Sequence, residues 1–249
     1  MADRISEDST VASLSEREIL AERPRDYLRR DLGALVDYSG QPSLRAAFLS
    51  LGIRRVLEVG TGLEFEAIQQ LAGLQTSEEE PFFKPEDLWA VDPEIWTDER
   101  LACLQRVKPF FKRFSRGSAL AQEVARQIKE GCPPFDLVFS KGVASIGGLL
   151  RGDETIEQTR ENGLAIIAAM GECLNPANPH ALLLACTKSD SILPFCQGDL
   201  EDLGLAIVYA EEVQGQTAKD WIEVLQRAKI FPPSGETFSN LVICKRSQA

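Results

Sequence analysis

The feature that most constrains the fold is an alternation of short apolar runs with longer helical stretches from residue 55 onward. Apolar, β-branched runs predict strands, and the apolar spacing of the intervening segments predicts helices. The predicted strands are 55–59, 88–91, 110–114, 135–140, 181–186, 206–209 and 241–244, and the predicted helices are 64–74, 98–107, 119–130 and 155–174. Such alternation is typical of βαβ units, whose parallel sheet is buried on both faces. We therefore predict an α/β protein with helices on both faces of a mostly parallel sheet.

The two ends of the chain depart from this alternation. Residues 1–15 are rich in Ser, Asp and Glu, and we predict that they are disordered. Residues 16–51 have helical spacing, interrupted at Ser39-Gly40, and are predicted to form an N-terminal helical cap. The last two strands, joined through a short helix at 218–229, are predicted to form an antiparallel pair at one edge. No Pro/Gly/Ser-rich linker divides residues 16–249, which we expect to be a single domain.

Composition argues against several classes of partner. With 27 Lys and Arg against 38 Asp and Glu, the net charge is −11, whereas nucleic-acid binding usually requires a basic face. The six cysteines are scattered without a Cys-x-x-Cys pair, so we expect free buried thiols and no metal site. No apolar run approaches the length of a membrane span, and the first residues do not resemble a signal peptide. We expect a cytoplasmic protein that binds neither nucleic acid nor membrane.

The strongest local motif is the segment from Val56 to Glu64, VLEVGTGLE, in which an apolar strand ends in a glycine turn. Glycines allow a ligand to approach the backbone closely, and the N–H groups at the start of the next helix favour an anionic group. A dinucleotide site would need Gly-x-Gly-x-x-Gly, but Phe65 stands where the last glycine belongs. A nicotinamide-dependent oxidoreductase is therefore the less favoured interpretation.

The segment resembles instead the first motif of the Rossmann-like (class I) S-adenosylmethionine-dependent methyltransferases, an acidic residue followed by Gly-x-Gly. Glu58, Gly60 and Gly62 match this pattern, and Glu64 replaces the third glycine common in the family. The resemblance implies a Rossmann-like seven-stranded sheet with an antiparallel last strand. It also implies that Glu58, Gly60, Thr61 and Gly62 contact S-adenosylmethionine as the cofactor.

Two further segments carry the resemblance. The strand that ends at Asp92 places a carboxylate where the family binds the ribose hydroxyls, with Glu94 as a second candidate. The alternative is that Asp92 only starts an Asp-Pro turn. Gly117 and Ser118 follow the third strand, where a similar turn lies near the adenine; Ser118 could equally cap the next helix.

The fourth strand, FDLVFS at residues 135–140, resembles the family's fourth motif. The carboxyl end of this strand lies beside the cofactor and the reacting methyl group in such proteins. The resemblance therefore implies that Ser140 and Lys141 contact the cofactor and, with Gly142, form the floor of the reaction site. The alternative for Lys141 is a solvated loop lysine.

No catalytic residue can be assigned from the sequence. The only histidine, His180, precedes the fifth strand and should lie at the opposite end of the sheet. Tyr38, Lys141, Lys188 and Asp190 are polar candidates for the reactive end. We predict a methyltransferase that acts on a small organic molecule. The alternative is a non-catalytic relative that binds an adenosyl ligand in a regulatory role.

Overall fold

The computed structural model describes residues 32–60, 66–74, 82–92, 113–116, 120–131, 133–145, 155–187, 191–213, 216–230 and 238–247. The predicted disordered segment 1–15 and the predicted helix 98–107 lie outside these ranges. The strands are β1 (Val56–Val59), β2 (Leu88–Asp92), β3 (Arg113–Arg116), β4 (Leu137–Lys141), β5 (Leu182–Cys186), β6 (Leu205–Glu212) and β7 (Ser239–Arg246). The helices are α3 (Gly33–Ser39), α4 (Leu44–Ser50), α5 (Glu66–Ala72), the 3₁₀ turn η1 (Pro85–Asp87), α7 (Leu120–Lys129), α9 (Ile156–Glu172), α10 (Gln197–Asp202) and α11 (Gln216–Arg227).

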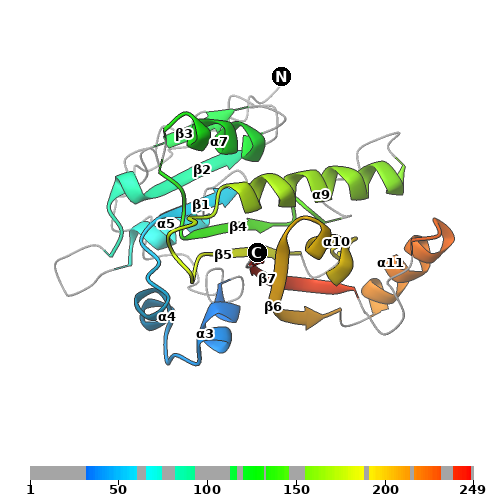
Figure 1. Ribbon diagram of the computed structural model, residues 1–249. Helices are drawn as coiled ribbons and strands as arrows, with labels where there is room; N and C mark the ends of the chain where they lie inside the picture. Colours follow the sequence, from blue (N-terminus) through cyan, green and yellow to red (C-terminus); the bar gives the residue numbers. More distant parts are fainter. Residues whose placement is uncertain are drawn as a thin grey trace, which may run out of the picture.

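The described strands form one seven-stranded sheet in the order β3-β2-β1-β4-β5-β7-β6 (Figure 1). The pairs from β3 to β5 are parallel, whereas β7 runs antiparallel to both β5 and β6. The predicted fold class, a mostly parallel Rossmann-like sheet with an antiparallel last strand, is confirmed. The third strand lies at Arg113–Arg116, later than the predicted 110–114, and α10 was not predicted.

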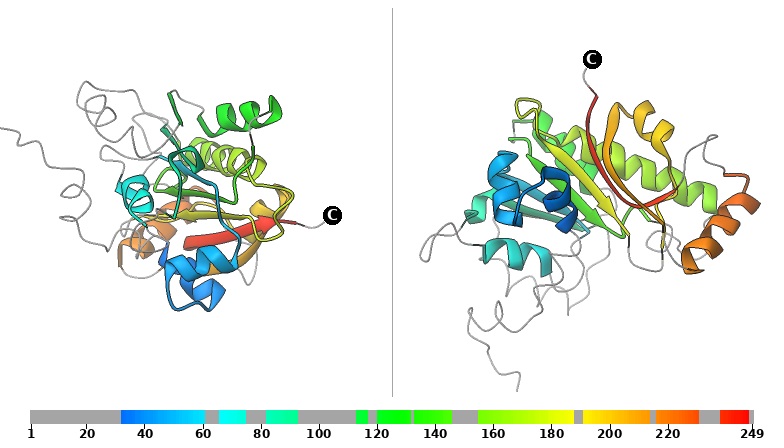
Figure 2. Two further views of the ribbon diagram at one scale, coloured as in Figure 1. Left: turned by 90° about the vertical axis from the view of Figure 1, so that its left-hand side faces the viewer. Right: turned by 90° about the horizontal axis from the view of Figure 1, so that it is seen from below.

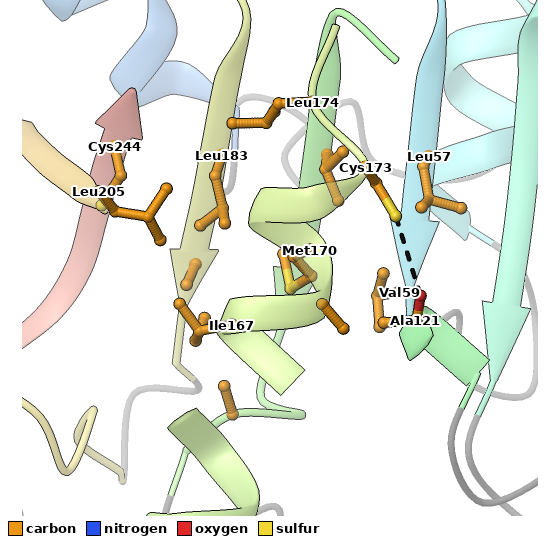
Figure 3. Packing of buried hydrophobic residues seen from close by; sticks show 14 of the residues in the cluster. Leu57, Val59, Ala121, Ile167, Met170, Cys173, Leu174, Leu183, Leu205 and Cys244 are labelled. Carbon is orange, nitrogen blue, oxygen red and sulfur yellow. Dashed lines mark hydrogen bonds between the residues drawn. The ribbon is translucent and has the colours of Figure 1, made fainter. Parts of the chain in front are cut away.

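Two helical layers cover the sheet, as alternate side chains of each buried strand predict (Figure 2). On one face, Val56, Leu137 and Leu184 pack against α3, α4 and α5. On the other face, Leu57 and Val138 belong to a cluster with α7, α9 and α10 (Figure 3). The α/β alternation of the sequence therefore arises because both faces of the central strands are covered.

The N-terminal helices belong to this core. α3 ends at Gly40, which has a left-handed φ of 63° and donates its N–H to the last turn. This glycine is the predicted break before α4, because a residue with a side chain is strained in that conformation. Phe48 of α4 is fully buried and contacts Phe82 and Phe83. Among the described helices, none has the length and apolarity that a membrane span requires.

The four described cysteines are free and buried. The Cys173 thiol points from the end of α9 to the carbonyl oxygen of Ala121 at 3.8 Å (Figure 3). Burial raises the pKa of Cys173 to about 12, and that of Cys244 to about 12 as well. These thiols remain neutral at physiological pH and act as small apolar core residues, as predicted.

A buried carboxylate joins three segments at the amino edge of the sheet. Asp136 is 6% exposed and accepts hydrogen bonds from the backbone N–H groups of Arg54 (3.0 Å) and Arg55 (3.1 Å). Its other oxygen accepts from the side-chain amides of Asn175 (3.0 Å) and Asn178 (2.9 Å). The starts of β1 and β4 and the turn before β5 are thereby held together. Sequence reasoning treated Asp136 only as part of the fourth motif and missed this role.

Candidate functional site

The strand order creates one position where a ligand site is expected. From β1 the chain continues outward to β2 and β3, whereas β4 and β5 lie on the other side of β1. α5, which follows β1, packs on one face, and α9, which follows β4, packs on the other. Open α/β sheets bind ligands outside the carboxyl ends of the strands at such a switch point. The candidate site is therefore the edge formed by the carboxyl ends of β1, β2, β4 and β5.

Gly60 begins the turn at the centre of this edge. Its N–H donates to the carbonyl oxygen of Val91 at 2.8 Å, which extends the contact between β1 and β2. Its φ is +82°, and a Cβ at this position would lie 1.8 Å from Cγ2 of Val143. From the sequence, this glycine is predicted to allow the close approach of a cofactor. The structure gives a second reason, since Val143 in the loop after β4 occupies the space of the missing side chain.

Two acidic residues lie on the strands of this edge. Glu58 is 3% exposed and shares the face of Val56, on which α5 packs. Asp92 is the last residue of β2 and immediately follows Val91, the hydrogen-bond partner of Gly60. The predicted juxtaposition of the glycine turn with the end of the strand at Asp92 is therefore present in the backbone. The side chain of Asp92 lies outside the description.

The carboxyl end of β4 lies on the side of β1 opposite β2. Ser140 pairs with Val59 of β1 and Ala185 of β5, and its side chain is 1% exposed. Lys141 is half-buried and pairs with Cys186. Gly142 donates its N–H to the carbonyl oxygen of Cys186 at 2.8 Å, and the Ser145 hydroxyl donates to the Gly142 oxygen at 2.8 Å. These bonds fix the turn that holds Val143 against Gly60.

The remaining predicted contacts lie outside the described residues. This group comprises Thr61, Gly62, Gly117, Ser118, Glu94, Lys188 and Asp190. In sequence, Gly117 and Ser118 directly follow β3. The predicted site residues therefore belong to, or follow, the carboxyl ends of four neighbouring strands, β3, β2, β1 and β4.

One polar candidate is in the wrong place. Lys245 places its Nζ over the ring of Tyr38, 5.5 Å from the centroid. β7 runs antiparallel to β5, so the later residues of β7 lie near the amino end of β5. Cys244, which directly precedes Lys245, pairs there with Leu183. The contact with Lys245 places Tyr38 of α3 beside the later part of β7. Tyr38 therefore lies toward the amino edge of the sheet, opposite the candidate site. His180 is exposed in the turn before β5, as predicted.

An apolar cluster borders the site beyond β5. Ile192, Leu225 and Phe238 are buried together, and Trp221 of α11 packs against them. Ile156, the first residue of α9, packs against the same cluster. Because α9 follows the carboxyl end of β4, this contact places the cluster toward the carboxyl edge. The segment between β6 and β7, which contains α11, contributes Leu225 and Trp221 to this cluster.

Comparison with known proteins gives matches to solved structures alone. No protein-family model matches the chain, and no curated protein matches it. One similar structure is magnesium protoporphyrin IX methyltransferase from Synechocystis PCC 6803 with bound SAM, at 12% identity and a TM-score of 0.42, covering 96% of this chain and 100% of that one. Another is the CcbJ methyltransferase from Streptomyces caelestis, at 10% identity and a TM-score of 0.44, covering 82% and 94%. TrmN from Thermus thermophilus has 16% identity and a TM-score of 0.40, covering 88% and 52%.

The strand order and the position of the candidate site define the class of fold. The chain is a Rossmann-like α/β protein with a seven-stranded sheet, a switch point between β1 and β4 and an antiparallel β7. Its own strand order and residues, rather than these distant similarities, support the function proposed below.

Proposed function

We propose that this protein is an S-adenosylmethionine-dependent methyltransferase that acts on a small organic molecule. The observation that carries the proposal is the convergence of the methyltransferase-like motifs on one edge. Gly60, Asp92 and Ser140 come from sequence positions far apart, yet they end or follow adjacent strands on both sides of the switch point. A ligand outside these strand ends would face all three segments.

Each segment suits a different part of an adenosyl ligand. Glu58 and Gly60, at the end of β1, together with Thr61 and Gly62, which follow in the sequence, would hold the amino-acid portion. A carboxylate at Asp92 can accept hydrogen bonds from two ribose hydroxyls. Gly117 and Ser118, after β3, would border the adenine. Ser140 and Lys141 would line the side where the acceptor approaches.

The buried hydroxyl of Ser140 is compatible with a ligand at this edge. Its oxygen is inaccessible to solvent and has no hydrogen-bond partner among the described residues. Burying a hydroxyl without a partner costs free energy, so such groups usually have a functional explanation. A ligand group that bonded this hydroxyl would remove that cost.

The bound cofactor would supply an activated methyl group on a sulfonium sulfur. The protein's contribution would then be to position the acceptor and to exclude water, which can account for much of the rate. No general base is assigned. Tyr38 and His180 lie toward the other edge, Lys188 and Asp190 lie outside the described residues, and a lysine that is protonated at neutral pH, such as Lys141, is a poor base.

Calorimetric titration with S-adenosylhomocysteine, and separately with NAD, tests the cofactor. We expect the wild-type protein to bind the former and not the latter. Asp92→Ala and Asp92→Asn should each weaken binding by about 10- to 100-fold, the effect of losing charge-assisted hydrogen bonds to ribose. Asp202→Ala, a change at an exposed carboxylate at the end of α10, is the matched control. Unchanged affinity in both Asp92 variants would refute the ribose assignment.

Transfer of a labelled methyl group from S-adenosylmethionine to a cellular small-molecule extract tests catalysis. The second candidate, an adenosyl-binding protein without catalysis, is favoured by Glu64 at the third glycine position and by the lack of an assigned base. Binding of S-adenosylhomocysteine without any labelled product would support that candidate. A labelled small molecule would exclude it.

A further inference from the structure

A second unpartnered polar atom lies on the same face as the Ser140 hydroxyl. The side-chain oxygen of Asn240, near the start of β7, is inaccessible to solvent and has no hydrogen-bond partner among the described residues. Neither the methyltransferase resemblance nor the proposed cofactor site includes Asn240. A buried carbonyl oxygen without a donor costs free energy, so its retention calls for an explanation.

The strand register places both atoms on one face and near one edge. Ser140 pairs with Ala185, and Ala185 pairs with Val242. Asn240 precedes Val242 by two residues, so its side chain projects on the same face as those of Val242 and Ser140. The backbone carbonyl oxygen of Asn240, as distinct from its side-chain oxygen, accepts from the N–H of Thr187, just after β5, at 2.8 Å. The two unpartnered atoms therefore flank the carboxyl end of β5.

The spacing suits a small molecule. Neighbouring strands lie about 4.8 Å apart and each residue advances about 3.3 Å along a strand, so Ser140 and Asn240, two strands and two residues apart, are separated by about 12 Å. One ligand of modest size could reach both Ser140 and Asn240. The two side chains differ in what they offer, because the Ser140 hydroxyl can donate or accept, whereas the Asn240 oxygen can only accept.

An apolar wall lies next to Asn240. Phe238 precedes it by two residues and is buried with Ile192 and Leu225. The N–H of Leu193 donates to the carbonyl oxygen of Ser239 at 3.0 Å, so the loop after β5 runs alongside the start of β7. A ligand near Asn240 would therefore meet one hydrogen-bond acceptor and a mainly apolar surface.

We propose that Asn240 is a specificity-determining residue that binds the methyl acceptor, with Ser140 as its second polar contact. The acceptor is a neutral small molecule with an apolar body and a hydroxyl or amine group, which donates a hydrogen bond to the Asn240 oxygen. This inference rests on the proposed function.

The test uses the full chain and compares two Asn→Leu variants. Asn240→Leu removes the unpartnered oxygen at the carboxyl edge. Asn178→Leu is the matched control at the amino edge, where the amide donates to Asp136 and to the carbonyl oxygen of Gly52. Each variant is measured for affinity toward S-adenosylhomocysteine, for transfer of labelled methyl groups to the small-molecule extract, and for melting temperature.

For Asn240→Leu, we expect cofactor affinity within twofold of wild type, methyl transfer reduced at least tenfold, and a melting temperature equal to or above that of wild type. Asn178→Leu should lower the melting temperature and leave the other two quantities unchanged. Undiminished methyl transfer by Asn240→Leu, or a melting temperature lowered as much as in Asn178→Leu, would overturn the assignment of Asn240. If the wild-type protein itself binds no S-adenosylhomocysteine, the proposed function fails and takes this inference with it.

Discussion

Replacement of Asp136 by alanine should be among the most destabilising single changes to a carboxylate in this protein. The Asp136 carboxylate accepts four hydrogen bonds, two of them from the backbone of Arg54 and Arg55. Asp136→Ala leaves four donors without their acceptor next to a small cavity. At about 1 kcal/mol for each bond, with partial replacement by water at the exposed donors, the loss is about 3–4 kcal/mol. That is a large fraction of a typical unfolding free energy of about 5–15 kcal/mol.

Asp136→Asn removes the negative charge of this side chain but keeps its size and shape. An asparagine keeps one acceptor oxygen but presents its NH₂ group to one of the two donor pairs, so we expect a loss of about 2–3 kcal/mol. Urea unfolding followed by tryptophan fluorescence measures both variants, and Asp202→Ala, at an exposed carboxylate, should change stability by less than about 0.5 kcal/mol. A loss below about 1 kcal/mol for Asp136→Ala would show that the four bonds do not hold the amino edge together.

Three further changes test other parts of the structure. Gly60→Ala should destabilise by about 2–4 kcal/mol in urea unfolding, because its Cβ meets Val143 and its φ is positive; Val143→Ala in the same chain should recover part of the loss. Lys229→Gly should stabilise by about 0.5–1 kcal/mol, because Lys229 has a φ of 59° at the end of α11; a lower urea midpoint would contradict this. Burial raises the pKa of Cys244 from 9.0 to about 12, so the folded state holds the thiol proton more tightly. The stability that this provides is complete below about pH 9 and is lost between about pH 9 and 12, and the decline measured by urea unfolding should be smaller in Cys244→Ala.

The sequence predicted the sheet well because its strands are buried on both faces. A run such as 181–186 has no polar position, and only a central strand between two helical layers accommodates that pattern. The β3 boundary was misplaced because the apolar run begins at Phe110, whereas β3 is Arg113–Arg116. α10 was missed because QGDLED has only one apolar position, Leu200, which packs against the sheet. A single apolar residue produces no helical periodicity.

The candidate site was only partly predictable for a different reason. Strand ends are visible in a sequence, so the relation between Gly60 and Asp92 could be inferred from alternation alone. Contacts between loops are not visible, and the packing of Val143 against Gly60 depends on the turn after β4. Asn240 could not be found from sequence either. It is notable only because the antiparallel register of β7 brings it beside the end of β5.

The two edges of the sheet differ in how completely their polar groups are satisfied. At the amino edge, the Asp136 carboxylate has four donors and joins three segments, so this edge stabilises the fold. At the carboxyl edge, the Ser140 hydroxyl and the Asn240 oxygen are buried without partners among the described residues, and Gly60 has a positive φ. Proteins commonly retain such local costs where a ligand binds, because a ligand can supply the missing hydrogen bonds. Ser140→Ala should therefore raise the melting temperature while reducing methyl transfer, and a variant that lost stability instead would place the origin of this asymmetry in packing rather than in ligand binding.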